Sequence, residues 1–144
     1  MWQHRFTHDT DLSVDAIWPV IADVARWPEV DHNIKALEIS GTPGPGVAFV
    51  LKPKGGPRLA FTIGAFDAPH TYSDICRMPL ARMETTHRLA PRPEGGTRLV
   101  VEIAITGPLA RLWGVLVGRK HAAGLPAQTQ RILVRAAAQA RSAA

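Results

Sequence analysis

The sequence predicts an α+β domain in which a curved antiparallel sheet of seven strands wraps around a long C-terminal helix. Three observations predict it. The first ten residues alternate with period two, residues 34 to 106 carry six β-type runs joined by short connections, and the residues after Pro108 return to a helical period. Short connections between consecutive strands favour antiparallel neighbours. The expected order is one strand, a short helix, six strands and a C-terminal helix.

The length and composition of the chain predict a single domain over residues 1–144. A chain of 144 residues is long enough to bury one proper core, and 46% hydrophobic with 20% charged residues is typical of an ordinary globular protein. No apolar run approaches the roughly 20 residues of a membrane-spanning helix, and the first residues lack the apolar stretch of a signal peptide. The expected location is therefore the cytoplasm.

The N-terminal segment is expected to form a strand and then a short helix. From Trp2 to Thr10, aromatic and histidine side chains alternate with more polar ones, as in a strand with one covered face. Ser13 is a suitable N-cap for the helix that follows. Pro19 removes a backbone hydrogen bond from a helix interior, so the helix either begins after Ser13 or kinks. The pair Trp27–Pro28 is expected to end the helix.

Residues 34 to 106 are expected to form a six-stranded meander. β-branched and aromatic runs are separated there by connections rich in Gly, Pro and Asp. The six runs are Ile34 to Ser40, Val47 to Pro53, Arg58 to Phe66, Thr71 to Arg77, Arg82 to Leu89 and Thr97 to Thr106.

The C-terminal region is expected to form two helical pieces with a bend or break near Gly124, because Gly124 and Pro126 separate two apolar stripes. The first stripe is Leu109, Leu112, Trp113, Leu116 and Val117, and the second is Leu125, Thr129, Ile132, Leu133, Ala136 and Ala140. We interpret the first stripe as core between helix and sheet. The alternative is a lid that lines the mouth of a cavity.

Three stretches of the sequence resemble the START-like superfamily, also called SRPBCC, of polyketide cyclases, dehydratases and lipid-transport proteins. They are Ile21 to Glu29, Glu94 to Leu99, and Gly107 to Pro126, and with the element order the resemblance covers nearly the whole chain. Val30 departs from it, because the family often carries a second tryptophan there. The resemblance implies a helix-grip fold and a bound lipid, quinone, hormone or polyketide, whereas a fold alone does not determine an activity.

The strands around Pro79–Leu80 predict a small-ligand site. If these two residues form a tight turn, Tyr72 pairs with His87, Asp74 with Thr85, and Cys76 with Met83, all facing inward. The outer face then collects Ser73, Arg77, Arg82, Glu84, Thr86 and Arg88, while Leu59, Phe61, Ile63 and Ala65 on one neighbouring strand and Leu99, Val101, Ile103 and Ile105 on the other also face inward. A mainly apolar interior with a few polar groups is typical of a ligand site. The candidate ligand-binding residues are Phe61, Ile63, Tyr72, Asp74, Met83, Thr85, His87, Val101, Ile103, Trp113, Leu116 and Leu133.

Two interpretations of His87 and Asp74 stay open. In the first, the two residues are structural: they form a hydrogen-bonded pair, or they lie in water at the edge of a cavity. In the second, His87 is oriented by Asp74 and either orients a ligand carbonyl or acts as an acid-base catalyst, with Tyr72 as a second donor to the same oxygen. Cys76 is interpreted as a small hydrophobe. His4, His8, His32, His70 and His121 show no metal-ligand spacing and are treated as surface or edge residues, so no metal and no cofactor is expected.

The net charge of +5 fits an arginine-rich composition better than a nucleic-acid partner. No acidic residue follows Glu102, and Arg111, Arg119, Lys120, Arg131, Arg135 and Arg141 do. With the resemblance and the predicted interior, the sequence leaves three functions open. The protein binds or transports a small apolar or aromatic molecule, or it is a polyketide cyclase or dehydratase, or it is a carrier of a lipid or quinone. The carrier would make peripheral contact with an anionic membrane through residues 109 to 117.

Overall fold

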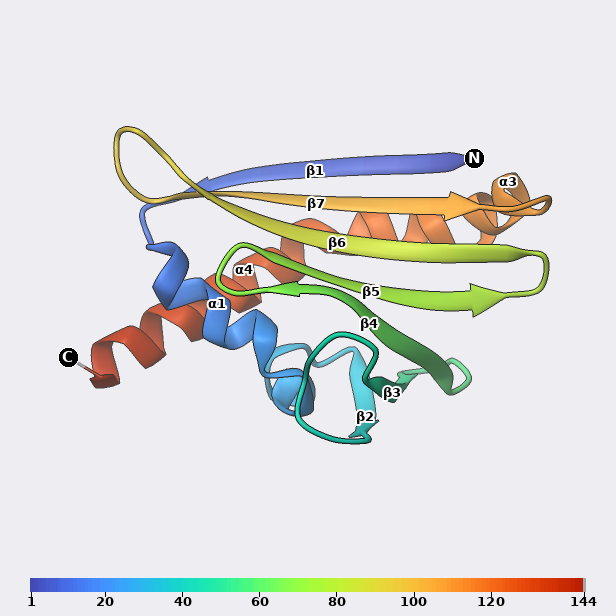
Figure 1. Ribbon diagram of the computed structural model, residues 1–144, viewed down its shortest axis with the longest axis horizontal. Coiled ribbons are helices and arrows are strands. Elements are labelled where there is room, and N and C mark those ends of the chain that lie inside the picture. Colours follow the sequence, from blue (N-terminus) through green and yellow to red (C-terminus); the bar gives the residue numbers. More distant parts are fainter. Residues whose placement is uncertain (144) are drawn as a thin grey trace.

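The structure is a computed structural model that describes residues 1–143. Seven antiparallel strands form one sheet in the order β1-β7-β6-β5-β4-β3-β2 (Figure 1). Strands β2 to β7 follow one another in the sheet as in the sequence, so the predicted meander is confirmed. The strands are β1 (Trp2–Thr10), β2 (Ile34–Ile39), β3 (Ala48–Pro53), β4 (Leu59–Asp67), β5 (Thr71–Met78), β6 (Ala81–Pro91) and β7 (Thr97–Thr106).

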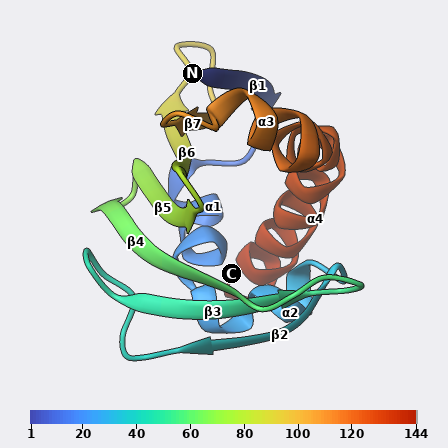
Figure 2. The same cartoon turned by 90° about the vertical axis from the view of Figure 1, so that its right-hand side faces the viewer.

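The helices close the concave side of this curved sheet. In Figure 2 the seven strands form an open arc, and α4 runs across its open side. The predicted α+β class with a sheet wrapped on a long C-terminal helix is therefore confirmed. The helical elements are α1 (Val14–Ala22), the 3-10 turn η1 (Val24–Arg26), α2 (Trp27–Val30), α3 (Ala110–Trp113), the π-helical segment η2 (Gly114–Gly118) and α4 (Arg119–Ala143).

Helix α1 begins where its cap predicts. The Ser13 hydroxyl accepts a hydrogen bond from the Ala16 backbone N–H at 3.2 Å and the helix begins at Val14, so the alternative of a start later than this cap is wrong. The helix ends at Ala22, and Trp27 and Pro28 begin α2 rather than ending α1. Proline is tolerated there because the first helical residues have no intrahelical partner for an N–H.

An irregularity in β4 changes which side chains face inward. The pairing of β4 with β5 shifts between Ile63 and Phe66, so Phe66 faces the interior and Ala65, which was expected inside, is exposed. Ser73 was expected on the wet face, yet it is fully buried beside this irregularity. Its hydroxyl accepts from the Ala65 backbone N–H at 2.8 Å and donates to the Glu84 carboxylate at 2.9 Å. These hydrogen bonds satisfy the backbone that the irregularity leaves unpaired.

The C-terminal helix is not broken near Gly124. Helix α4 runs through Gly124 and Pro126, because its buried face of Leu125, Thr129, Leu133 and Ala136 packs against the rest of the protein. The irregular segment is η2, and two of its glycines pack against Trp2. A Cβ atom added at Gly114 would lie 2.5 Å from Cδ1 of Trp2, and one added at Gly118 would lie 2.6 Å from Cζ3. Only glycine therefore fits at these two positions.

The apolar interior is divided into two clusters. The first packs α1 and Leu133 of α4 against Phe49, Tyr72 and Leu89 of the sheet, and the second packs Met83 and Ile105 against the beginning of α4. On β5 and β6 the side chains that lie between the two clusters are polar. In residues 1–143, the helices are all too short or too polar to cross a bilayer.

Candidate functional site

A belt of polar side chains crosses the concave face between the two apolar clusters. It consists of Tyr72 and Asp74 from β5, Thr85 and His87 from β6, and His121 from α4, which we call the polar belt. The predicted pairing is confirmed, because Tyr72 lies opposite His87 and Asp74 lies opposite Thr85. Alternation along each strand places all four strand residues on one face.

Direct hydrogen bonds join four members of the polar belt in two pairs. The Tyr72 hydroxyl donates to the Asp74 carboxyl at 3.1 Å, and both residues are buried. The Thr85 hydroxyl lies 3.1 Å from Nε2 of His121, so α4 is joined directly to the centre of the sheet. Asp74 therefore bonds to Tyr72, and a hydrogen bond between Asp74 and His87, which the sequence left open, is absent from the described residues.

His87 is the fifth member of the polar belt, and one of its ring nitrogens has no partner. Its Nδ1 atom is buried without a hydrogen bond within residues 1–143. Its ring is tilted against that of Tyr72, with a centroid separation of 6.0 Å. An unsatisfied buried polar atom costs about 1–3 kcal/mol, so this nitrogen is the position in the polar belt best suited to an added polar group.

Burial changes the ionisation of the polar belt. Burial, with a smaller contribution from the Glu84 charge, raises the pKa of Asp74 to about 7, although the hydrogen bond from Tyr72 opposes this. Burial, assisted by the nearby His121, lowers the pKa of His87 to about 4. Burial likewise lowers the pKa of His121 and raises that of Tyr72. At neutral pH the two histidines are therefore uncharged and Asp74 is close to half protonated.

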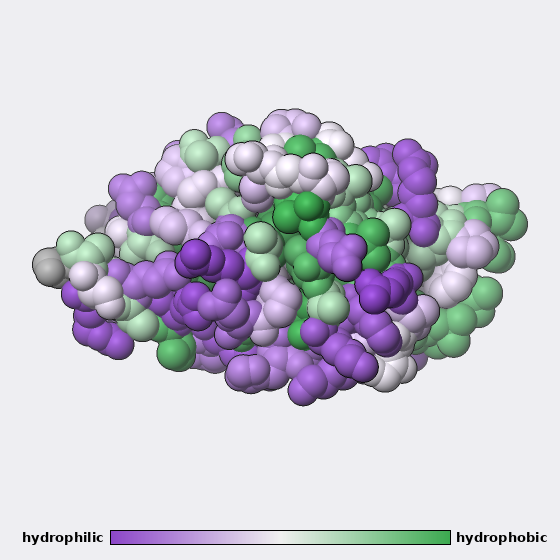
Figure 3. All heavy atoms as spheres, turned by 90° about the horizontal axis from the view of Figure 1, so that it is seen from below, coloured by the Kyte–Doolittle hydropathy of each residue, from purple (hydrophilic) through white to green (hydrophobic). Residues whose placement is uncertain are grey.

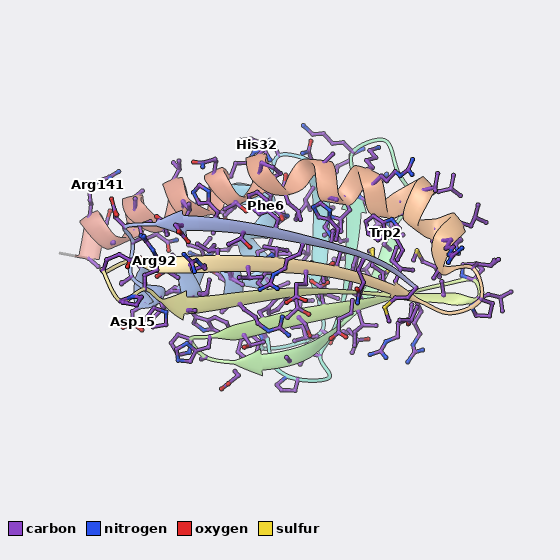
Figure 4. The ribbon with its side chains drawn as sticks, turned by 90° about the horizontal axis from the view of Figure 1, so that it is seen from above. Trp2, Phe6, Asp15, His32, Arg92 and Arg141 are labelled. Carbon is purple, nitrogen blue, oxygen red and sulfur yellow. The ribbon has the colours of Figure 1, made fainter. Side chains whose placement is uncertain are left out.

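Most of the apolar residues expected at the site surround the polar belt. Ile63, Asp74, Thr85 and Ile103 form one row across four strands, and Val101 lies beside His87 in the next row. Met83 and Phe61 lie on the side of the second apolar cluster, and Leu133 belongs to the first. Phe61 and Phe6 are only half-buried, although both pack against the second apolar cluster. Figure 4 shows Phe6 and Trp2 on the side of β1 that faces α4.

Two expected site residues lie elsewhere. Leu116 is 59% exposed, and the neighbouring Leu112 is 50% exposed, so the interpretation of this stripe as core is wrong for both. The half-buried Trp113 donates from its indole N–H to the Pro79 carbonyl at 2.9 Å, at the end of the sheet rather than at the polar belt. The reason is that η2 turns its small residues, Gly114 and Gly118, toward Trp2, while Val115 and Leu116 face outward.

His121 is the member of the polar belt that sequence reasoning missed. It was treated as a surface or edge residue, whereas it is half-buried and bonds to Thr85. A signal was present, because His121 lies four residues before Leu125 and thus continues the second apolar stripe of the C-terminal region. The expected break near Gly124 separated His121 from that stripe. Among residues 1–143, no cluster of His, Cys, Asp and Glu could hold a metal ion.

Neither of two recesses of the surface is lined by a residue of the polar belt. One of about 10 Å³ is lined by Val20, Asp23, Arg26, Val30, Arg135 and Gln139. An open depression of about 340 Å³ over β1 and β7 is lined by Gln3, His4, Arg5, Glu102, Ile103 and Ala104. From below, apolar side chains are visible among polar ones in the middle of the molecule and again at its right-hand end (Figure 3).

One known protein family matches almost the whole chain. The family model described as polyketide cyclase / dehydrase and lipid transport matches residues 1–140. The chain belongs to this family. The resemblance that the sequence carries to the START-like superfamily is thereby confirmed for the whole fold. A search of the curated proteins found no match.

Solved structures show the same fold for this family member. The Zhui aromatase/cyclase from Streptomyces sp. R1128 is 18% identical, with a TM-score of 0.72 over 99% of this chain and 97% of that one. A protein from Thermus thermophilus is 16% identical, with a TM-score of 0.72 over 96% and 99%. Norcoclaurine synthase from Thalictrum flavum is 15% identical, with a TM-score of 0.68 over 92% and 86%. At these identities the likeness shows the fold alone.

Proposed function

We propose that the protein binds a small aromatic or apolar molecule that carries an oxygen group, in the interior between the concave face of the sheet and α4. The observation that carries the proposal is the buried Nδ1 atom of His87, which has no hydrogen-bond partner within residues 1–143. Such an atom is destabilising until a partner arrives, so a ligand hydroxyl or carbonyl at this point gains a hydrogen bond that the free protein lacks.

The surroundings of His87 support an uncharged ligand. The low pKa of His87, about 4, keeps the ring neutral at physiological pH, and His121 is held neutral in the same way. A neutral imidazole has one donor and one acceptor nitrogen, so it can pair with a phenol or a ketone. The half-buried rings of Phe6 and Phe61 supply apolar surface for the rest of the molecule.

Calorimetric titration with two compounds of matched shape tests the need for an oxygen. We expect 2-naphthol to bind about tenfold more tightly than 2-methylnaphthalene, the ratio that one additional hydrogen bond provides. His87→Phe should remove this preference. His32→Phe, on the exposed turn before β2, should retain it. Equal affinity of the two compounds for the unaltered protein, or no binding of either together with no co-purified mass in native mass spectrometry, would contradict the proposal.

A second candidate function is acid-base catalysis in the same interior, as in a polyketide cyclase or dehydratase. The observation that favours it is the pKa of Asp74 near 7, beside the neutral base His87 and the Tyr72 hydroxyl. A group with a pKa close to the working pH can both give and take a proton. The family description and the name of the Zhui aromatase/cyclase support this reading.

Separation of binding from turnover distinguishes the two candidates. If the protein is an enzyme, His87→Ala removes turnover of an authentic substrate and leaves its binding measurable, whereas Val134→Ala on the exposed side of α4 changes neither. An unchanged rate in His87→Ala would eliminate the catalytic role and leave the binding function standing.

A further inference from the structure

We infer that the end of the molecule formed by the β5–β6 turn, α3 and η2 docks on an anionic membrane surface. Four of the six large hydrophobic side chains that are exposed in residues 1–143 gather there, and we call them the apolar tip. They are Leu80 (65% exposed), Leu112 (50%), Val115 (52%) and Leu116 (59%). A concentration of exposed aliphatic side chains in one place marks an interaction site rather than ordinary surface.

Two hydrogen bonds hold the parts of the apolar tip together. The indole N–H of Trp113 donates to the Pro79 carbonyl at 2.9 Å, and the Leu109 backbone N–H donates to the Leu80 carbonyl at 3.1 Å. The β5–β6 turn is therefore fixed against the beginning of α3. In Figure 1 both elements lie at the right-hand end of the molecule, and Figure 3 shows apolar atoms gathered at that end.

Exposed basic residues accompany the apolar tip. Five of them lie on the ends of β5 and β6 beside the turn, on α3 and on the first turn of α4. Within residues 1–143 none of the five forms an ion pair: Arg77, Arg82, Arg111, Arg119 and Lys120. Arg77 lies directly opposite Arg82 in the β5–β6 pair, an arrangement of like charges that is unfavourable unless an anion lies nearby. The charge of this end therefore complements the negative surface of an anionic lipid layer.

The shape of the apolar tip favours a lipid surface over a protein partner. The tip projects from the end of the sheet, and its side chains are aliphatic rather than the aromatic ones that dominate protein interfaces. Leu80 supports this, because it has a positive φ of 54°, a conformation that glycine adopts more easily. A leucine there suits insertion among lipid chains, as at the apolar side of interfacial helices.

Flotation of the full chain with lipid vesicles tests this inference. We expect it to bind vesicles of equimolar phosphatidylcholine and phosphatidylglycerol, to bind pure phosphatidylcholine at least about tenfold more weakly, and to dissociate as salt rises. The double variant Leu112→Ser/Leu116→Ser should bind the anionic vesicles about tenfold more weakly. The matched control is Val134→Ser, which alters a side chain 67% exposed on α4 outside the apolar tip and should bind like the unaltered protein.

Two further variants separate loss of docking from loss of folding. Leu80→Gly relieves the positive-φ leucine, and Arg77→Gln/Arg82→Gln relieves the opposed charges, so both should bind vesicles more weakly without a lower unfolding midpoint. No binding to anionic vesicles at low salt would overturn the inference. An equal loss of vesicle binding in Val134→Ser, or unchanged vesicle binding in the leucine variants, would also overturn it. So would displacement of the protein from vesicles by soluble polyglutamate to the same extent with and without the leucines, because that result would indicate an acidic protein as the partner.

Discussion

Gly114→Ala is expected to destabilise the protein although alanine is the better helix former. The added methyl group would lie 2.5 Å from Cδ1 and 3.0 Å from Cβ of Trp2, and it would also meet Cγ of that ring. These atoms are at the root of the side chain, so rotation of the outer ring cannot relieve the overlap. Overpacking costs about 1–3 kcal/mol and the helix preference of alanine returns about 1 kcal/mol, which leaves a net loss of up to about 2 kcal/mol.

Gly124→Ala is the matched control, because it places the same methyl group elsewhere on the C-terminal helical region. Nothing lies within 4 Å of an added Cβ at Gly124, so only the helix preference acts and stability should rise by up to about 1 kcal/mol. Urea unfolding followed by far-ultraviolet circular dichroism measures both variants. In the Trp2→Ala background the Gly114→Ala loss should disappear. Equal stabilisation by the two glycine substitutions, or a Gly114→Ala loss that persists without Trp2, would refute the reasoning.

Three other expectations concern stability. Folding raises the pKa of the Asp74 carboxyl from 3.8 to about 7, so the contribution of Asp74 to stability is full below pH 3.8 and is lost as the pH rises through 7. Folding lowers the pKa of His87 from 6.5 to about 4, so the contribution of His87 to stability grows as the pH rises from 4 to 6.5. Between pH 4 and 6.5 the two contributions therefore change with pH in opposite directions. Urea unfolding should show stability rising with pH in Asp74→Asn, where only the His87 contribution remains, and falling with pH in His87→Gln, where only the Asp74 contribution remains. Parallel pH profiles of the two variants would contradict this. Thr85→Val removes the partner of His121 Nε2 and should cost about 1–2 kcal/mol in the same assay, and a neutral result would mean that this hydrogen bond contributes nothing. Leu80→Gly should raise the free energy of unfolding by about 1 kcal/mol because it relieves a left-handed leucine, and a decrease would show that the leucine side chain stabilises the fold.

The sheet and its facing residues could be predicted because they depend on local pattern. Alternation along β5 and β6, with the two-residue turn at Pro79 and Leu80, sufficed to pair Tyr72 with His87 and Asp74 with Thr85. The prediction that Ala65 faces inward was wrong, because an irregularity in β4 reverses which side chains face the interior beyond Ile63. The hydrogen bond that stabilises this irregularity is made with Ser73, which lies on another strand. A period-two pattern carries no record of such a contact.

The polar belt could be predicted only in part. Its four strand residues follow from register, but the hydrogen-bond partners do not, since Asp74 bonds to Tyr72 and leaves Nδ1 of His87 without one. His121 comes from α4, and its bond to Thr85 depends on how the helix lies across the sheet. Distances between distant segments are decided by packing, which a one-dimensional spacing does not encode.

The sequence by itself determined the fold class, the order of the strands and the register of β5 with β6, because these follow from alternation and turns acting over a few residues. Only the tertiary structure decided that α4 continues through Gly124 and that Leu112 of α3 and Leu116 of η2 face outward. The physical reason is contact between segments far apart in the chain: Trp2 lies against Gly114 and Gly118, and that contact sets which side of the helical region faces water.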